Sequence, residues 1–334
     1  MSDLAIISAD SALPPNVTGT VVTVGTFDGV HRGHLDVLAR LVGRAAATGR
    51  PSVLVSFDPH PLEIVNPVAA PPLLSSLEEK LEVIAETGVN YFAVVPFTNA
   101  LAAYSAEAFV NEILRRRFRM RELLIGHDHG FGHHRAGNVG VLQQLGAEQG
   151  FAVEVVEAVS LSDGQHVSST SIRRALAGGD LVRAAEGLGR AYSVGGVVVH
   201  GEGRGRDLGF ATINVAPSSS RKLLPPVGVY AVRVQTPRGP FDGMMNLGPR
   251  PTFGESTTSL EAHLFGAEGD FYGANVRIDF ISFLRDTRRF ANAEELTRQL
   301  KQDREDAQRA LTPFIAPGNL NGYPGTINFT QSVA

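Results

Sequence analysis

The stretch that decides the fold runs from residue 20 to residue 34: Thr20-Val21-Val22-Thr23-Val24-Gly25-Thr26-Phe27-Asp28-Gly29-Val30-His31-Arg32-Gly33-His34. Its first five residues are all β-branched, which predicts a buried strand. A glycine-rich turn follows, and apolar residues at three- and four-residue spacing then predict a helix over 34–48. A helix that starts directly after such a turn presents free backbone N–H groups, which favour an anion. The stretch therefore predicts a strand–turn–helix unit that handles phosphate.

The same alternation of short apolar runs and amphipathic stretches continues to about residue 160. The runs that predict strands are 20–24, 52–57, 89–95, 122–125 and 152–158. The stretches that predict helices are 34–48, 77–87, 106–118 and 139–149, and two short helices are expected at 170–177 and 181–187. Strands that alternate with helices pair in parallel. The first half therefore predicts a Rossmann-like α/β fold, a parallel sheet with helices on both faces.

The pattern changes beyond Gly189, where short strands are separated by Gly/Pro turns. These strands are expected at 193–200, 229–235, 243–247, 259–265 and 275–284, and one long helix at 293–311. Several short strands in succession predict a small antiparallel barrel, closed here by the last helix. We place the boundary near Leu188–Ala191, so that the domains are 1–188 and 189–312. Residues 313–334 are expected to form an extended tail.

Composition excludes several classes of protein. The chain has no cysteine, which rules out disulfides, Cys–zinc sites, Fe–S clusters and cysteine nucleophiles. All but three of its 30 basic residues are arginines, and none of Lys80, Lys222 and Lys301 follows a glycine, so there is no Walker A loop. A net charge of −4 argues against a general polyanion binder. No apolar stretch approaches the roughly 20 residues of a membrane span, and no targeting segment is recognisable, so we expect a cytoplasmic protein without a membrane partner.

Three histidines near the first two strands are candidates for ligand contact. His31 and His34 are three residues apart, so at a helix start they share one face, and Gly33 leaves room between them. The simpler alternative is a capped helix with two surface histidines, but the strand, turn and helix together favour phosphate binding. His60 lies between two prolines and is either a rigid loop residue or a ligand contact.

Two further segments of the first half carry polar chemistry. Histidines and Asp128 gather in 127–134, which raises the question of a metal; the absence of cysteine and the many glycines disfavour a structural one. Ser168 and Ser169 precede a short helix that begins at Thr170 and has Arg173 one turn inside. Hydroxyl groups, N–H groups and a guanidinium in this arrangement predict an anion clamp.

These motifs, taken in order, resemble those of the bifunctional prokaryotic riboflavin kinase/FMN adenylyltransferases, also called FAD synthetases. The matching segments are 25–34, 56–61, 126–138 and 167–173 in the first half, and 200–214, 246–253, 260–265 and 282–290 in the second. The resemblance covers about residues 15–312. The Gly/Arg-rich loop at 201–209 is not a dinucleotide fingerprint, because Leu208 stands where a third glycine is required.

The resemblance implies two successive phosphate transfers from ATP. In the second domain Glu261 would take the proton of the riboflavin 5′-hydroxyl, and Thr212 and Asn214 would hold Mg²⁺, giving FMN. In the first domain FMN would be adenylylated to FAD with release of pyrophosphate, and His31, His34 and Arg173 would stabilise charge. The other residues implied to contact ATP or flavin are Gly25, Phe27, Asp28, Gly33, His60, Asp128, Arg135, Ser168, Ser169, Thr170, Gly203, Arg204, Gly209, Arg250 and Arg285.

Departures from the family pattern leave two alternatives open. Gly130 stands where the family often has arginine, and Ala211 replaces a proline, so one half could bind flavin or nucleotide without turnover. The second alternative is a non-enzymatic flavin-responsive or nucleic-acid-binding protein, but aromatic residues are only 7% and tryptophan is absent. We expect flavins and ATP as partners and no nucleic acid, and a homo-oligomer is left open.

Overall fold

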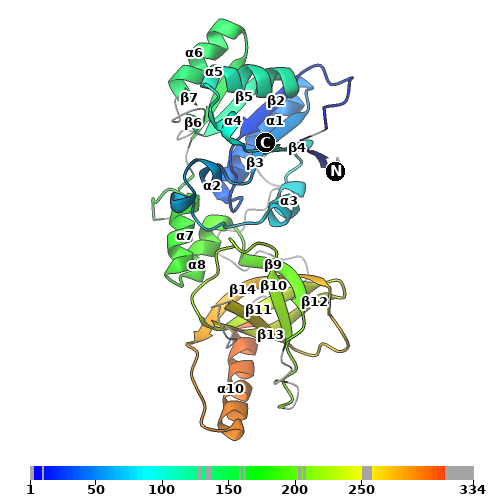
Figure 1. Cartoon of the computed structure of the whole chain (residues 1–334), viewed down its shortest axis with the longest axis vertical. Helices are drawn as coiled ribbons and strands as arrows, with labels where there is room; N and C mark the ends of the chain where they lie inside the picture. The colour runs from blue at the N-terminus through cyan, green and yellow to red at the C-terminus, as the bar shows by residue number, and fades with distance from the viewer. Residues whose placement is uncertain are drawn as a thin grey trace. The chain divides into compact units, whose positions relative to one another are not determined.

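The computed structural model describes residues 4–9, 11–126, 130–131, 137–157, 159–160, 163–201, 205, 208–249 and 258–312. Contacts divide the chain into two compact units after Ser168 (Figure 1). The domain boundary expected near 188 stays a prediction, as does the tail at 313–334, which lies outside the described residues. No helix in the described part of the chain is long and apolar enough to cross a membrane.

A six-stranded sheet forms the centre of the N-terminal unit. Its strands are β1 (Ala5–Ile7), β2 (Thr20–Val24), β3 (Ser52–Asp58), β4 (Tyr91–Pro96), β5 (Met120–Gly126) and β8 (Ala152–Val156). They lie in the order β1-β4-β3-β2-β5-β8, and all neighbours pair in parallel, which confirms the expected sheet. The sequence reading missed β1, because three residues are too few to show a strand period.

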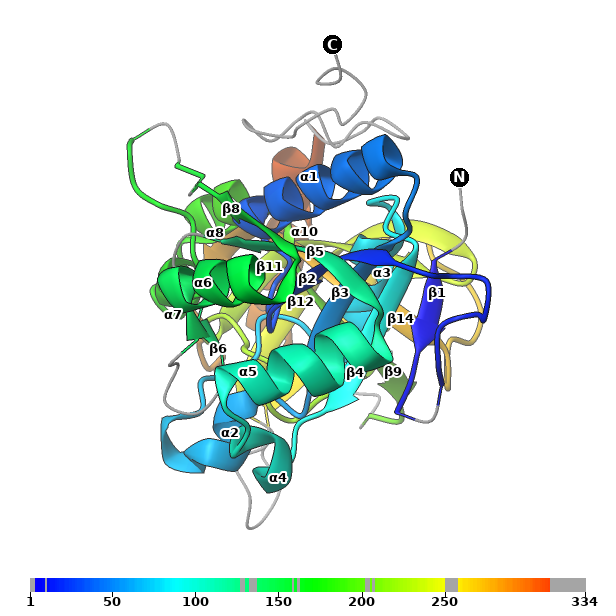
Figure 2. The same cartoon turned by 90° about the horizontal axis from the view of Figure 1, so that it is seen from above.

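Helices cover both faces of this sheet. Val21 and Leu54 pack with α1 (Arg32–Thr48) and α3 (Leu77–Ala85). Val22 and Val53, whose side chains point the other way, pack with the helical segment at 106–117 and with α6 (Val139–Gln149). The segment at 106–117 comprises α5 (Ala106–Phe109) and a π-helix, η2 (Val110–Arg117). Figure 2 shows α1 and α5 on opposite sides of the central strands. Shorter elements are α2 (Pro61–Val65), η1 (Pro67–Ala69), α4 (Asn99–Ala102), β6 (Gly130–Phe131) and β7 (Gly137–Asn138).

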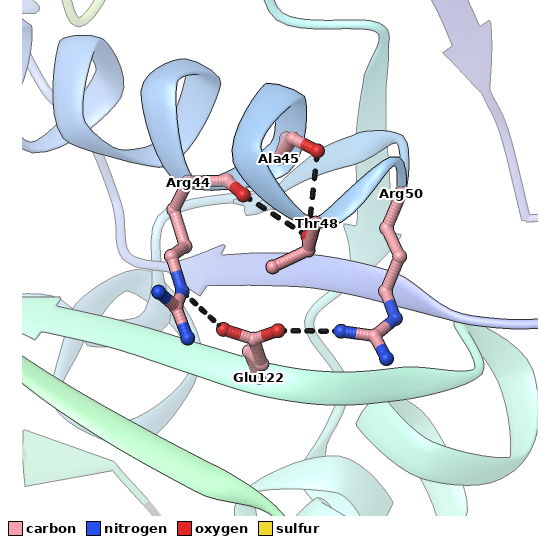
Figure 3. Close-up of polar contacts among 5 residues, drawn as sticks. All are labelled: Arg44, Ala45, Thr48, Arg50 and Glu122. Carbon is pink, nitrogen blue, oxygen red and sulfur yellow. Dashed lines mark hydrogen bonds and ion pairs between the residues drawn. The ribbon is translucent and has the colours of Figure 1, made fainter.

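One buried carboxylate ties the end of α1 to the sheet. The side chain of Glu122, on β5, is 9% exposed and accepts from Arg44 Nε at 2.5 Å and from Arg50 Nη1 at 2.6 Å (Figure 3). The hydrogen bond and the charge of Glu122 raise the pKa of the Arg44 guanidinium. The two histidines lie at the other end of α1. The two ion pairs of Glu122 therefore help to fix the position of the helix that carries them.

We expect Glu122→Gln to lower the melting temperature of the N-terminal unit by about 3–8 °C, because two charge-assisted hydrogen bonds to a buried carboxylate are weakened. Differential scanning calorimetry measures this shift. The matched control is Glu112→Gln, which removes an exposed pair with Arg116 and should shift the melting temperature by less than about 1 °C. Equal shifts of the melting temperature in the two variants would show that the ion pairs of Glu122 do not stabilise the unit.

The C-terminal unit contains a closed six-stranded antiparallel barrel. Its elements are α7 (Ser169–Ala177), α8 (Leu181–Leu188), β9 (Tyr192–Val199), β10 (Ile213–Pro217), β11 (Gly228–Thr236), β12 (Gly239–Pro249), β13 (Thr258–Leu264), β14 (Asn275–Arg285) and α10 (Ala293–Leu311). The strands close in the order β10-β13-β12-β11-β14-β9. The expected barrel and closing helix are confirmed, but the sequence reading missed β10 and left it in a loop.

The long helix packs on the outside of this barrel. Ala231 of β11 and Met244 of β12 are paired residues on the outer face, and they form one apolar cluster with Ala307 and Leu311 of α10. Phe210, which ends the Gly/Arg-rich loop, joins the same cluster. The helix (orange in Figure 1) thus covers the part of the outer face formed by β11 and β12 around Ala231 and Met244.

Candidate active sites

The glycine-rich turn leaves the sheet at the point where strand order reverses. From β2 the chain adds β3 and β4 on one side, and later adds β5 and β8 on the other. In open parallel sheets, ligand sites form outside the carboxyl ends of the strands at such a switch point. The turn at 25–31 follows the carboxyl end of β2, so the sheet places it where a nucleotide would be expected.

The backbone of this turn is strained. Phe27 has φ 47° and Val30 has φ 38°, both in the left-handed region, and Gly29 between them has φ 81°. Non-glycine residues in that region cost on the order of 1–3 kcal/mol each and persist where the surroundings hold them. Strain of this kind is typical of ligand-binding turns, and here it directly precedes the two histidines.

The two histidines stack on each other at the start of α1. His31 is the N-cap, and its Nδ1 accepts from the backbone N–H of His34 at 3.3 Å. Their ring centroids are 3.6 Å apart with 15° between the planes, and Phe27 lies 4.7 Å from the His34 ring. Since Nδ1 of His31 is the acceptor, the proton of a neutral His31 ring lies on Nε2, which is then the donor for a ligand.

Glycines give this arrangement its room. A Cβ at Gly33 would lie 3.2 Å from Cε1 of His31, and one at Gly25 would lie 3.0 Å from the Phe27 ring. The same position on Gly33 is 3.9 Å from the carbonyl oxygen of Val167, so the start of the Ser168 motif lies beside the helix start. The sequence had placed the helix start at His34; the structure places it two residues earlier, because His31 provides the capping nitrogen.

Asp28 is held inside the unit. It is 1% exposed, and its carboxylate accepts from the backbone N–H groups of Leu74 and Ser75 at 3.0 Å. The Ser75 hydroxyl in turn accepts from the N–H of Gly29 at 2.8 Å. These bonds fasten the turn to the segment that precedes α3. Contact of Asp28 with a nucleotide stays a prediction.

His60 caps a short helix. Its Nδ1 accepts from the N–H of Leu62 at 3.2 Å, and Glu63 Oε1 accepts from its backbone N–H at 3.1 Å. This geometry orients the imidazole at the start of α2, after the carboxyl end of β3. The ligand contact of His60 stays a prediction.

The structure does not test the remaining residues predicted for the adenylyl site. Ser169, Thr170 and Arg173 lie in α7, which belongs to the second unit. Asp128 and Arg135 lie outside the described residues, and so does most of the histidine-rich segment at 127–134. Among the kinase residues, Gly203, Arg204 and Arg250 also lie outside them.

On the barrel, Glu261 lies between two asparagines. In the strand register Asn214 of β10 is directly opposite Glu261 of β13, and Glu261 is directly opposite Asn246 of β12. Opposed residues of antiparallel strands point to the same face, with Cβ atoms about 4.5–5.5 Å apart. Leu260 and Ala262 are buried and alternate with Glu261, so the three polar side chains form one row on the outer face.

Asn214 is suited to hold a cation. It is 7% exposed, and its Oδ1 is buried without a hydrogen-bond partner among the described residues. A Cβ at Gly201 would lie 2.0 Å from Asn214 Nδ2, so only glycine allows the backbone at residue 201 to come this close to the Asn214 side chain. Thr212 lines a cavity of about 450 Å³ with Phe271 and Tyr272. Amide and hydroxyl oxygens are ligands that Mg²⁺ accepts, so the donor set fits that ion.

Hydrogen bonds hold the backbone at Phe210 and Ala211, shortly before Asn214. Gly209 has φ 78°, and Phe210 N–H donates to the carbonyl of Gly205 at 2.9 Å. His263, two residues beyond Glu261 on β13, has its Nδ1 2.8 Å from the carbonyl oxygen of Ala211. These contacts hold the backbone that leads into Thr212. They do so although Ala211 stands where the family pattern has a proline.

Arg285 lies in the same cross-strand row as Asn246, through Val229 of β11. Its guanidinium donates to both oxygens of Asp303 on α10, at 2.7 and 2.6 Å, and Asp303 is 1% exposed. The predicted flavin contact of Arg285 is untested, and in the structure this side chain joins the barrel to its helix.

Comparisons with known proteins agree with both halves of this description. The family model for FAD synthetase matches residues 13–171, and that for riboflavin kinase matches residues 188–311. A bifunctional riboflavin kinase/FMN adenylyltransferase of Escherichia coli (strain K12) is 37% identical over 286 residues, which cover 85% of this chain and 90% of the relative. One from Pseudomonas fluorescens is 39% identical over 302 residues, which cover 90% and 96%.

The chain belongs to the bifunctional riboflavin kinase/FMN adenylyltransferase family. It is accordingly an enzyme with two activities, an FMN adenylyltransferase in the N-terminal part and a riboflavin kinase in the C-terminal part. A crystal structure described as a macrolide-efflux protein from Streptococcus pneumoniae has a TM-score of 0.81 and 27% identity, over 91% of this chain and 98% of that one. The folds of both parts therefore occur in a solved structure.

Two polar residues of the kinase part were missed from the sequence. Asn246 had been placed in the expected strand 243–247 and in the matching segment 246–253 without a role of its own, because its place beside Glu261 depends on strand register. Asp303 left a signal that could have been used: it lies on the same helical stripe as Ala307 and Leu311, which are buried. An acidic residue on an apolar stripe indicates a buried partner, here Arg285.

Proposed function

We propose that the residues described above carry out the two reactions as successive phosphate transfers, first in the barrel and then in the N-terminal unit. Placement of Glu261 directly opposite Asn214 supports this assignment most strongly, because it puts a candidate base next to a candidate cation ligand.

In the kinase reaction Glu261 accepts the proton of the riboflavin 5′-hydroxyl while that oxygen attacks the γ-phosphorus of ATP, and ADP leaves. Thr212 and Asn214 would hold Mg²⁺, which when bound supplies positive charge next to the ATP phosphates. Asn246, on the other side of Glu261, orients the carboxylate or the flavin hydroxyl by hydrogen bonding. The cavity beside Thr212 offers room for part of the nucleotide.

In the adenylyl transfer an FMN phosphate oxygen attacks the α-phosphorus of a second ATP, and pyrophosphate leaves. The Nε2–H of His31 donates to an oxygen of the transferring nucleotide or of pyrophosphate, and His34 supports it by stacking. Arg173 and the hydroxyl groups of Ser168 to Thr170 are proposed to bind the phosphates. No covalent intermediate with the protein is required, because positioning and electrostatic stabilisation supply most of the effect.

Chromatographic identification of products tests the order of the two steps. Purified chain incubated with riboflavin, ATP and Mg²⁺ is expected to accumulate FMN first and then FAD, and chelation of the metal is expected to stop FMN formation. FAD that appears from riboflavin without passing through FMN would contradict the proposed sequence. Flavins and ATP are the expected partners; a cytoplasmic location stays a prediction.

A further inference from the structure

Lys80 is buried directly against the turn that leads to the histidines. It is 7% exposed and lies one turn inside α3. Its Nζ donates to the backbone carbonyl oxygen of Thr26 at 3.0 Å, across 54 residues of sequence. No motif assigns a role to this lysine, and its sequence context excludes a Walker loop.

The N-terminus of α3, the helix that carries Lys80, is fixed by a capping box. Ser76 caps α3 by accepting from the N–H of Glu79, and the Glu79 carboxylate accepts from the N–H of Ser76 at 2.8 Å. This reciprocal cap follows directly on Ser75, which already holds Gly29 and Asp28. Lys80 therefore reaches the turn from an element that is itself fastened to it.

A continuous set of contacts leads from Lys80 to the imidazoles. The Thr26 carbonyl also accepts from the Ser56 hydroxyl at 3.1 Å, so its peptide plane is held by two donors. That plane precedes the strained residue Phe27, whose ring packs against His34. His34 in turn stacks on His31.

Burial of this ammonium needs a compensating interaction. Burial lowers the pKa of Lys80 from its usual value. The charges that oppose this shift are those of Asp28, Asp58 and Glu63. A methionine would fill a similar volume without the cost of desolvating a charge. The ammonium is therefore best explained by the carbonyl that it binds.

We propose that Lys80 is a positioning residue for the adenylyl transfer. Through the Thr26 carbonyl it fixes the backbone of the turn at 25–31 and, with it, the placement of His31 and His34. This inference rests on the function proposed above for the N-terminal unit.

The test is Lys80→Met, assayed for FAD formation from FMN and ATP. The kcat is expected to fall about 10- to 100-fold, because small displacements of reacting groups cost that much, while KM for ATP changes less than about threefold. Riboflavin kinase activity of the same preparation should stay at the wild-type level. Lys80→Arg keeps the charge and the donors, and it is expected to recover kcat to within about fivefold of wild type.

Lys222→Met is the matched control. Lys222 is also 7% exposed, but it lies in the barrel unit with its Nζ 4.6 Å from the centroid of the Tyr192 ring. FAD formation is expected to be unchanged in this variant. A kcat of Lys80→Met within about threefold of wild type would overturn the proposal, and so would Lys80→Arg being no better than Lys80→Met at equal melting temperature.

Two further variants keep the test decisive. If Lys80→Met does not fold, Ser56→Ala, which removes the second donor to the Thr26 carbonyl, has to lower kcat at unchanged melting temperature; a normal kcat in Ser56→Ala overturns the proposal. His31→Asn separates this inference from the proposed site. Loss of FAD formation in His31→Asn but not in Lys80→Met refutes only the role of Lys80, whereas normal activity in both refutes the site.

Discussion

Glu261→Gln is expected to lower FMN formation from riboflavin by a factor of about 10²–10³, while FAD formation from supplied FMN continues at the wild-type rate. Glutamine keeps the size and a hydrogen-bond acceptor but cannot take up the proton of the attacking hydroxyl. The row Asn214–Glu261–Asn246 should stay intact, because its position is set by the backbone register of three strands. The loss should therefore appear in kcat more than in KM.

Separate assays of the two products measure this effect. Glu305→Gln provides the control, since it removes an acidic group from the exposed surface of α10 in the same unit. It should leave both rates unchanged. If Glu261→Gln makes FMN at a near-normal rate, Glu261 is not the base. If the variant also loses FAD formation from supplied FMN, the effect of the substitution is structural.

His31→Asn is expected to show the opposite separation of activities. FAD formation should fall about 10²–10³-fold, as it does when one charge-stabilising donor is removed, and FMN should accumulate from riboflavin. Asparagine is a good N-cap, so the acceptor for the N–H of His34 is retained and α1 should still start at the same residue. The imidazole donor on Nε2 is what the variant removes.

Comparison with His31→Ala distinguishes capping from catalysis. The alanine variant loses both the cap and the imidazole, so it should melt at a lower temperature than the asparagine variant while being equally inactive in FAD formation. An asparagine variant that restores FAD formation would show that His31 acts through the helix start alone. Kinase activity of the same samples reports whether the chain is folded.

The strand, the glycine-rich turn and the start of α1 could be predicted from the sequence because this arrangement is local. Strand, turn and helix follow one another within 15 residues, and the two histidines are neighbours on the same helical turn. What the local pattern could not show is how the turn is held. The partners of Asp28 are 46 and 47 residues away, and the two partners of Thr26 are 30 and 54 residues away. No periodicity in the sequence links such positions.

The kinase site was less accessible to the same reasoning. The segment 213–217 is short, follows a glycine-rich loop and ends in proline. It was therefore not predicted as a strand, although it forms β10. Without β10 there is no register to place Asn214 opposite Glu261. The flavin contact of Arg285 stays a prediction, and the sequence did not show that a buried aspartate on the last helix binds its guanidinium.

By itself the sequence determined the two fold classes and the order of the motifs, because these depend on periodicity and on short-range spacing; the residues that handle phosphate stay a prediction. Tertiary structure alone decided which side chains meet. Sheet order places the turn at the switch point, strand register puts Glu261 between two asparagines, and a distant helix brings Lys80 to Thr26. Such pairings depend on the closing of sheet and barrel, in which residues far apart in the chain become neighbours.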